Sequence, residues 1–303
     1  MESVDVAACG GLTLEDRPGG IVAVRFVAMA SPCELLLRRI DRAQALSLGV
    51  LVAAEAWRIE RKFSRYRPDS VIGWIHQRRG RRICVDAETA ALLDFSARCY
   101  ELTEGLFDVT SGVLRQAWTF DGSDNVPNAA EVARLLPFVG FSQVRWERPY
   151  LTLPAGMELD FGGFGKEYAV DRAFEILSHR YSRPFLLNFG GDLRANRAPA
   201  RAAWQIGIER PDQERTAALL LELDRGAVAT SGDAHRFLLK DGVRYGHVLD
   251  PRTGWPVVGA PRSVTVAAGS CTEAGLLATS ALLRSVDAEQ FLQMQGVRFW
   301  VIR

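Results

Sequence analysis

The stretch MELDFGGFGKEYAVDRAFEILSHR, from Met157 to Arg180, decides how the rest of the chain is interpreted. Its second half places four apolar residues at helical spacing: Ala169, Ala173, Ile176 and Leu177. The pattern predicts a strand ending at Asp160, a glycine turn, and a helix with Lys166 in its first turn. Such a turn favours an anion such as phosphate, because glycines let the backbone approach a ligand and a helix start presents free N–H groups. The alternative is an ordinary glycine turn with a surface lysine, since neither the Walker motif nor GxGxxG is present.

The composition is that of a globular protein with small-molecule or protein partners. The chain has 303 residues, 48% apolar and 24% charged, with a net charge of +1, which gives no global field for nucleic acid. Its five cysteines show no Cys-x-x-Cys spacing, and no stretch is long and apolar enough for a membrane span. The first twenty residues lack the pattern of a signal peptide, so we expect a cytoplasmic protein, or a periplasmic one if a leader is absent from this sequence. We divide it into an N-terminal tail, 1–20, and one domain, 21–303.

The spacing of apolar residues predicts an α+β fold rather than a regular βαβ alternation. Helices are expected over 41–62, where Leu46, Val50, Ala54 and Trp57 recur at helical spacing, over 87–102, from about 129, and over 273–283 with Thr272 as its cap. Strands are expected at 22–27, 33–37, 185–189, 204–208, 219–223, 227–229, 263–267 and 297–302, with a hairpin over 145–153.

Several polar segments accompany these elements, and each has a plain structural alternative. NFGGDLRA, Asn188 to Ala195, could hold a ribose or phosphate, or form a bulge. TSGD, Thr230 to Asp233, suits a nucleotide pocket or a helix cap. Tyr66 could stack on a flat heterocycle or fill the core.

His247 and Asp250 stand in YGHVLDPRTG, Tyr245 to Gly254. His247 could carry a proton, because its ordinary pKa lies near neutrality, and Asp250 could orient it or activate a hydroxyl. The alternative is a strand that runs into an Asp-Pro turn, with a histidine that satisfies a local hydrogen bond.

Taken in order, these segments resemble the ApbE family, the FAD:protein FMN transferases. The matches are Tyr66-x-Pro-x-Ser, Gly105-x-Phe-Asp, Asp160-x-Gly-Gly-x-x-Lys, Asn188-x-Gly-Gly-Asp, Thr230-Ser-Gly-Asp and His247-x-x-Asp-Pro-x-x-Gly, with a final helix carrying Ala278 and Thr279. The resemblance extends from about Phe26 to Leu283. It implies a T-fold-like α+β protein that binds FAD with Mg²⁺ and moves FMN onto a threonine or serine hydroxyl of an acceptor flavoprotein, with release of AMP.

The resemblance also implies residue roles. Met29 and Tyr66 would lie against the flavin, while Leu106, Phe107 and Asp108 would line the nucleotide site. Asp160 would hydrogen-bond the adenosine portion or fix the loop. Lys166 would reach the FAD, Gly163 and Thr279 would contribute to the metal site, and His247 and Asp250 would activate the acceptor hydroxyl.

The chain departs from the family pattern at four positions. Gly275 stands where the metal-binding aspartate belongs, and Glu273 or Asp233 is a possible substitute carboxylate. Ala30 and Ser31 replace a glycine and a threonine in the segment MASP. Glu167 stands where a glycine is frequent, which we interpret as the addition of a helix-forming residue.

Three functions follow from this pattern. An active transferase is favoured by the matching motifs. A flavin-binding protein that has lost transfer, and serves as carrier, sensor or partner subunit, is favoured by Gly275. A structural protein that shares only the fold would need none of the polar motifs.

Overall fold

The computed structural model describes residues 11–197, 203–233 and 236–303. Its centre is an eight-stranded sheet in the order β1-β2-β3-β7-β8-β11-β14-β15. The strands are β1 (Thr13–Arg17), β2 (Ile21–Ala28), β3 (Ser31–Arg38), β7 (Phe185–Phe189), β8 (Asp192–Ala195), β11 (Gly226–Gly232), β14 (Ser263–Ala268) and β15 (Arg298–Ile302). Neighbouring strands run antiparallel throughout. The α+β prediction is confirmed.

The structure places part of the predicted N-terminal tail in the central sheet. Of the predicted tail, 1–20, residues 1–10 lie outside the described part of the chain. Thr13–Arg17, however, forms strand β1 and pairs with Ile21–Arg25 of β2. The sheet therefore begins before residue 21.

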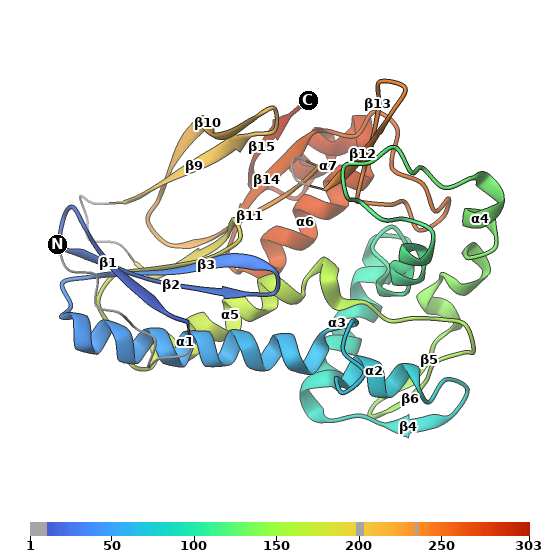
Figure 1. Ribbon diagram of the computed structural model, residues 1–303, viewed down its shortest axis with the longest axis horizontal. Coiled ribbons are helices and arrows are strands. Elements are labelled where there is room, and N and C mark those ends of the chain that lie inside the picture. The colour runs from blue at the N-terminus through green and yellow to red at the C-terminus, as the bar shows by residue number, and fades with distance from the viewer. Residues whose placement is uncertain (1–10, 198–202, 234–235) are drawn as a thin grey trace.

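Side chains of the central sheet alternate between two buried layers, as the period of a strand requires. Leu35 and Leu37 belong to the layer under α1 (Arg42–Phe63), α5 (Gly165–Ser178) and α6 (Cys271–Leu283), which follow one face of the sheet (Figure 1). Leu36 belongs to the opposite layer, which the hairpin β9 (Trp204–Arg210)–β10 (Gln213–Leu223) covers. The central strands are thus buried on both faces.

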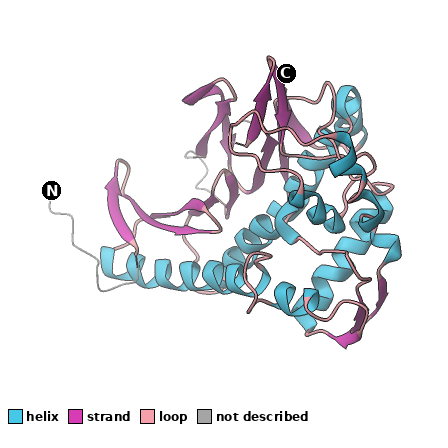
Figure 2. Ribbon diagram, turned by 45° about the vertical axis from the view of Figure 1, so that its right-hand side comes forward, coloured by secondary structure: helices cyan, strands magenta, loops and turns pink. Residues whose placement is uncertain are grey.

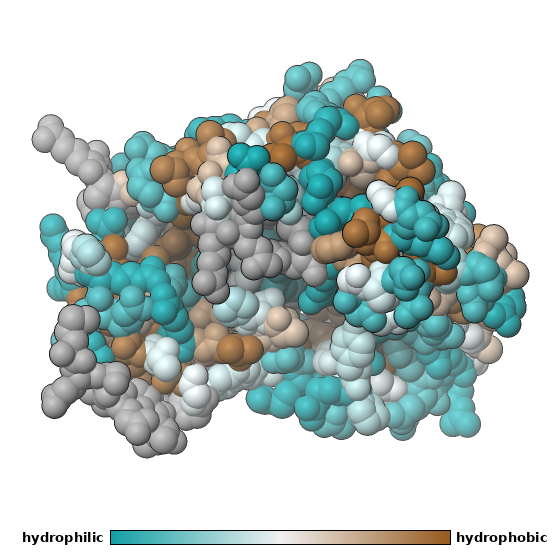
Figure 3. Space-filling model, turned by 45° about the horizontal axis from the view of Figure 1, so that its top comes forward, coloured by the Kyte–Doolittle hydropathy of each residue, from teal (hydrophilic) through white to brown (hydrophobic). Residues whose placement is uncertain are grey.

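Further helices and small sheets gather at one end of the molecule (Figure 2). They comprise α2 (Val71–His76), α3 (Ala87–Leu102), the 3-10 helix η1 (Val109–Gln116), α4 (Ala129–Ala133), the sheet β4 (Arg82–Cys84)–β6 (Tyr150–Thr152)–β5 (Arg145–Glu147), and the hairpin β12 (Phe237–Lys240)–β13 (Val243–Gly246). Helix α7 (Ala288–Met294) packs beside β15. On the face seen in Figure 3, hydrophilic side chains surround smaller hydrophobic areas. Among the described helices, none is long and apolar enough to cross a membrane.

Two local predictions are wrong. Met157–Asp160 is extended but joins no sheet, because its N–H groups have other partners: Leu159 donates to Nε2 of His76 at 2.8 Å, and Asp160 donates to the carbonyl of Val109. The cap of α6 is Ser270, whose side chain accepts the N–H of Glu273.

Candidate active site

The glycine turns of the sequence analysis meet at one end of the central sheet. The turn between β2 and β3 lies beside the β7–β8 turn, since the N–H of Gly190 donates to the carbonyl of Pro32 at 2.9 Å. Helix α5 begins beside β8, and α6 contacts β11, α5 and the 3-10 helix η4 (Phe161–Gly163). The segments that carry the motifs therefore converge in space although they lie far apart in sequence.

Asp160 fixes the loop that precedes α5. Its carboxylate accepts the N–H of Gly162 at 2.8 Å and pairs with Arg65 at 3.0 Å. Arg65 also donates to the carbonyl of Gly112. A Cβ at Gly112 would lie 2.5 Å from the Cβ of Asp160, so glycine is required for this close approach. Of the two roles considered for Asp160, these contacts support that of fixing the loop.

Tyr66 is not a core residue, because 81% of its surface is exposed. The guanidinium of its neighbour Arg65 lies 5.6 Å from the ring centroid. The ring is thus held at the surface, where it can stack on a flat ligand.

Arg115 is a further candidate site residue, which was not predicted from the sequence. It is half-buried on η1 and, among the described residues, makes no ion pair; its guanidinium lies 5.5 Å from the Phe120 ring. Burial lowers its pKa, and the charges that act on it include Asp160 and Tyr66. A half-buried cation without a carboxylate partner is suited to a phosphate. Arg115 lies in the segment TSGVLRQ, five residues after Thr110, and no motif in this segment indicated a binding residue.

His247 and Asp250 are not paired with each other. His247 follows β13 directly, and its Nδ1 has no hydrogen-bond partner. Burial, together with the charges of Arg115 and Arg236, lowers the His247 pKa to about 4, so the ring is neutral at pH 7. Asp250 accepts instead from the guanidinium of Arg252 at 2.7 Å, which outweighs burial and holds the Asp250 pKa below its usual value. The strand-and-turn interpretation of this segment thus describes Asp250 well, while His247 remains free to take a proton.

Lys166 points to the β7–β8 turn. Its Nζ lies 2.7 Å from Oδ2 of Asp192 and 3.4 Å from the carbonyl oxygen of Gly190. Burial alone would lower the Lys166 pKa, but the carboxylates of Asp192 and Glu167 raise it, so the ammonium stays charged. Asp192 is buried, with 2% of its surface exposed.

Gly275 and Thr279 lie one turn apart on α6, as the family resemblance implied. The hydroxyl of Thr279 lies 2.6 Å from that of Ser231 at the end of β11. Neither proposed substitute carboxylate is directed to Gly275. Glu273 is exposed and accepts the N–H of Gly269, while Asp233 pairs with Arg244 and Arg262 at 2.8 Å each.

The remaining predicted ligand-binding residues are mostly buried. Phe107 contacts the DFGG turn, where a Cβ at Gly163 would lie 3.1 Å from its ring. Leu106 and Asp108 are buried, and the Asp108 carboxylate accepts N–H groups of Thr110 and Phe141. Asp108 therefore holds local structure together.

Met29 lies half-buried in the β2–β3 turn. Both it and Ala30 have positive φ, 52° and 53°. The replacement of glycine by Ala30 thus leaves the turn in a conformation that glycine would adopt without strain.

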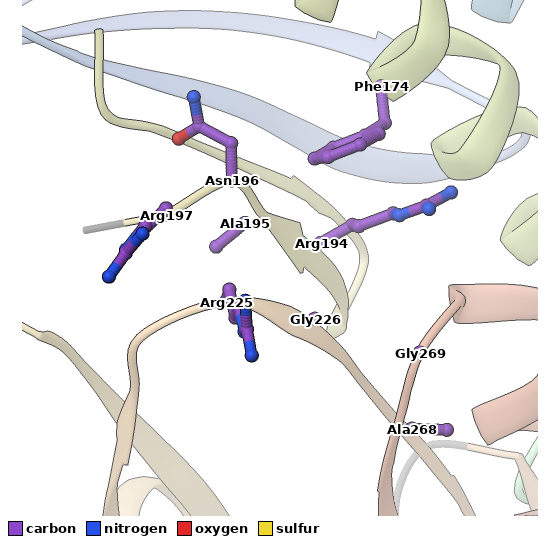
Figure 4. Close-up of a pocket in the computed structure, with 9 residues that line it drawn as sticks. All are labelled: Phe174, Arg194, Ala195, Asn196, Arg197, Arg225, Gly226, Ala268 and Gly269. Carbon is purple, nitrogen blue, oxygen red and sulfur yellow. The ribbon is translucent and has the colours of Figure 1, made fainter.

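A separate pocket of about 490 Å³ lies at the other end of β8, between Arg194, Arg225 and Gly269 (Figure 4). Arg194 stacks on Phe174 at 4.0 Å and pairs with Asp171. Arg194 and Ala195, at the end of the segment NFGGDLRA, line this pocket, but none of the predicted site residues does.

The motif segments of the described chain and Arg115 thus offer an exposed aromatic ring, a cation without a carboxylate partner, a neutral histidine and glycine turns, features that suit a flat, anionic ligand. The ApbE family model matches residues 29–300. An FAD:protein FMN transferase of Vibrio cholerae is 30% identical over 230 residues, which cover 73% of this chain and 69% of the relative. The chain belongs to the ApbE family.

Solved structures of ApbE proteins have the same fold as this chain. The ApbE protein of Thermotoga maritima superposes with a TM-score of 0.83 at 29% identity, covering 93% of this chain and 94% of that one. The flavin transferase ApbE of Vibrio cholerae gives 0.81 at 25% identity, with 94% of each chain covered.

Proposed function

We propose that this protein is an FAD:protein FMN transferase that uses Mg²⁺ and modifies a threonine or serine of an acceptor flavoprotein. Family membership supports the activity. The observation that carries the proposal for this chain is the grouping of Arg115 and His247 around the Phe120 ring, whose centroid lies 5.5 Å from the Arg115 guanidinium and 6.4 Å from the His247 ring. Tyr66 lies beside Arg65, which donates to the carbonyl of Gly112 on the same 3-10 helix as Arg115. An exposed ring suits the flavin, and the unpaired cation suits its diphosphate.

In the proposed reaction, the acceptor hydroxyl oxygen forms a bond to the phosphorus of the FMN portion. The bond between that phosphorus and the bridging oxygen breaks, and AMP leaves with the oxygen. The hydroxyl proton passes to the ring of His247, which is neutral and therefore able to accept it. The phosphates of bound FAD would offset the two arginine charges that lower the His247 pKa, and so strengthen the base. Asp250 is the weaker candidate, because Arg252 holds its carboxylate.

The residues at the proposed metal position fit Mg²⁺. The carbonyl of Gly163 and the hydroxyl of Thr279 are oxygen ligands, which this cation prefers. Glu167 extends a carboxylate with an unpartnered oxygen to the space beside Gly275. When bound, the cation would offset negative charge on the diphosphate.

The test is incubation of the protein with FAD, Mg²⁺ and a flavoprotein domain that carries a threonine acceptor. Covalent flavin on the acceptor, seen as in-gel fluorescence and a mass increase of one FMN, should appear together with AMP. Tyr66→Ala should weaken FAD binding at least about fivefold through lost stacking. The matched control is Tyr150→Ala, because Tyr150 is also exposed and stacked by an arginine, Arg82, but lies on β6. Absence of covalent flavin at every Mg²⁺ concentration would exclude the transferase.

The second candidate is a flavin-binding protein without transfer activity, which the missing carboxylate at Gly275 favours. It predicts FAD binding that depends on Tyr66, with neither covalent flavin nor AMP formed. Direct titration with FAD separates it from a protein that binds no flavin.

A further inference from the structure

Glu167 carries a buried carboxylate without a full set of partners. Only 8% of the residue is exposed, and its Oε2 makes no hydrogen bond. Burial of an unpaired carboxylate is costly, so an oxygen left in this state calls for a ligand.

This carboxylate fills the space in which a side chain at position 275 would begin. A Cβ on Gly275 would lie 2.7 Å from Oε1 of Glu167, 2.8 Å from its Cγ and 3.0 Å from its Cδ. These distances are too short for both side chains to occupy the space. Glu167 in this conformation and an aspartate at 275 therefore exclude each other.

The packing of α5 against α6 is fixed independently of Glu167. Asp171, one turn after Glu167, accepts the N–H groups of Cys271 and Thr272, each at 2.9 Å. Cys271 lies one turn before Gly275. The two helices thus pair residue 171 with 271 and residue 167 with 275, so the approach of Glu167 to Gly275 follows from the helix register.

Beside Gly275, two buried acidic side chains share a single cationic partner. Asp192 and Glu167 are two buried carboxylates that face a single ammonium, Lys166, which pairs with Asp192. Thr279 lies four residues after Gly275, on the same side of α6. A divalent cation between Glu167 and Thr279 would offset the negative charge that Glu167 carries when it is ionised.

We infer that Glu167 supplies, from helix α5, the carboxylate ligand for the divalent cation that residue 275 of α6 would otherwise supply. The inference rests on the proposed function and deepens it. The side chain of Glu167 on α5 occupies the space that an aspartate at position 275 of α6 would occupy. Residue 275 must then be glycine, because any Cβ there would collide with Glu167. The glutamate at 167, interpreted from the sequence as a helix-forming residue, and the glycine at 275 are thus two linked departures from the family pattern, because each one requires the other.

The test measures binding of Mn²⁺ alone, by electron paramagnetic resonance, to the full chain and four variants. Glu167→Gln keeps the shape and removes the charge, so Mn²⁺ affinity should fall at least about tenfold. The double variant Glu167→Gly/Gly275→Asp should bind within about threefold of the unmodified protein. Gly275→Asp alone should bind more weakly than the double variant, because its side chain collides with Glu167. The control is Glu55→Gln, since Glu55 is as buried but is paired with Arg58; its Mn²⁺ affinity should not change.

Unchanged Mn²⁺ binding in Glu167→Gln, or no binding by the unmodified protein, overturns the inference. If the double variant does not fold, Glu167→Gln against Glu55→Gln decides alone. FAD binding without metal is measured on the same proteins. If the unmodified protein binds no FAD, the result counts against the proposed function. If it binds FAD but its Mn²⁺ affinity does not depend on Glu167, the result counts only against the inference about Glu167.

Discussion

The Nε2 atom of His76 accepts the backbone N–H of Leu159 at 2.8 Å, and so ties helix α2 to the segment that leads into Asp160. The bond requires an unprotonated Nε2. Burial lowers the His76 pKa to about 4, and the charges of Arg79 and Arg65 act in the same direction, against that of Glu158. Acid should therefore loosen the attachment of this segment.

The sign of the effect on stability follows from the lowered pKa. The unfolded chain binds a proton near pH 6.5, whereas the folded chain binds it only near pH 4, so stability is present above about 6.5 and is lost as pH falls through 4. We expect the free energy of unfolding to decrease between pH 6.5 and 4.5 by about 1–2 kcal/mol more in the unmodified protein than in His76→Gln. Urea denaturation at several pH values measures this. Equal pH slopes for the two proteins would contradict it.

A second prediction concerns the β2–β3 turn. Ala30 has a φ of 53°, a left-handed conformation that costs a residue with a Cβ about 1–2 kcal/mol. Ala30→Gly should raise the free energy of unfolding by about 0.5–1 kcal/mol, after the greater entropy of glycine in the unfolded chain is subtracted.

Ala54 provides the matched control, because it is exposed in the middle of α1. Ala54→Gly should lower the free energy of unfolding by about 1 kcal/mol. The two substitutions are chemically identical, so opposite signs in urea denaturation would isolate the backbone conformation. A loss of stability in both would show that Ala30 is not strained.

Local sequence patterns predicted most of the helices and strands, but they did not predict correctly which face of a helix is buried. Helix α1 spans Arg42–Phe63, close to the predicted 41–62. Its buried face, however, contains Leu48 and Val52, while Val50 and Ala54 of the predicted stripe are exposed. A long helix with many small apolar residues offers several stripes of similar hydrophobicity, and only the sheet it covers selects one.

The segment Met157–Asp160 and the cap of α6 were mispredicted for a related reason. Alternating apolar residues suit a strand, but here a histidine side chain and the carbonyl of Val109 take the N–H groups. Thr272 and Ser270 are both chemically suitable caps, and Asp171 of α5 accepts from the Thr272 hydroxyl. Contacts between residues distant in sequence decide such cases, and no local pattern records them.

Within the candidate site, the sequence located the glycine turns and Tyr66 but not the partners of charged groups. Glu273 and Asp233 were chosen as substitute carboxylates because of their proximity in sequence or motif. Their hydrogen bonds lie elsewhere, and Glu167, over a hundred residues before Gly275, occupies the space. A residue that replaces a missing motif carboxylate, such as Glu167, is identified from the packing of α5 against α6 and not from the sequence near Gly275.

Arg115 gives the last prediction, because its charge is buried without a carboxylate partner. Arg115→Met keeps the length of the side chain against Phe120 and removes the charge. We expect FAD affinity to fall about 10- to 100-fold, the value of a charge-assisted hydrogen bond to a phosphate. The free energy of unfolding should stay unchanged or rise, since the substitution removes a desolvated cation whose pKa burial already lowers. Fluorescence titration with FAD and urea denaturation measure the two effects.

The combination of weaker binding and undiminished stability separates a ligand-binding role from a structural one. If Arg115 served only to pack η1 against Phe120, its replacement would lower stability and leave FAD affinity alone. Arg82→Met is the control, because Arg82 also stacks on an aromatic ring, that of Tyr150 at 3.8 Å, but its side chain is mostly exposed on β4. Its replacement should change neither quantity beyond about 0.5 kcal/mol. Equal FAD affinity in Arg115→Met and Arg82→Met would show that Arg115 does not contact the diphosphate. The charge of Arg115 would then have no function in FAD binding.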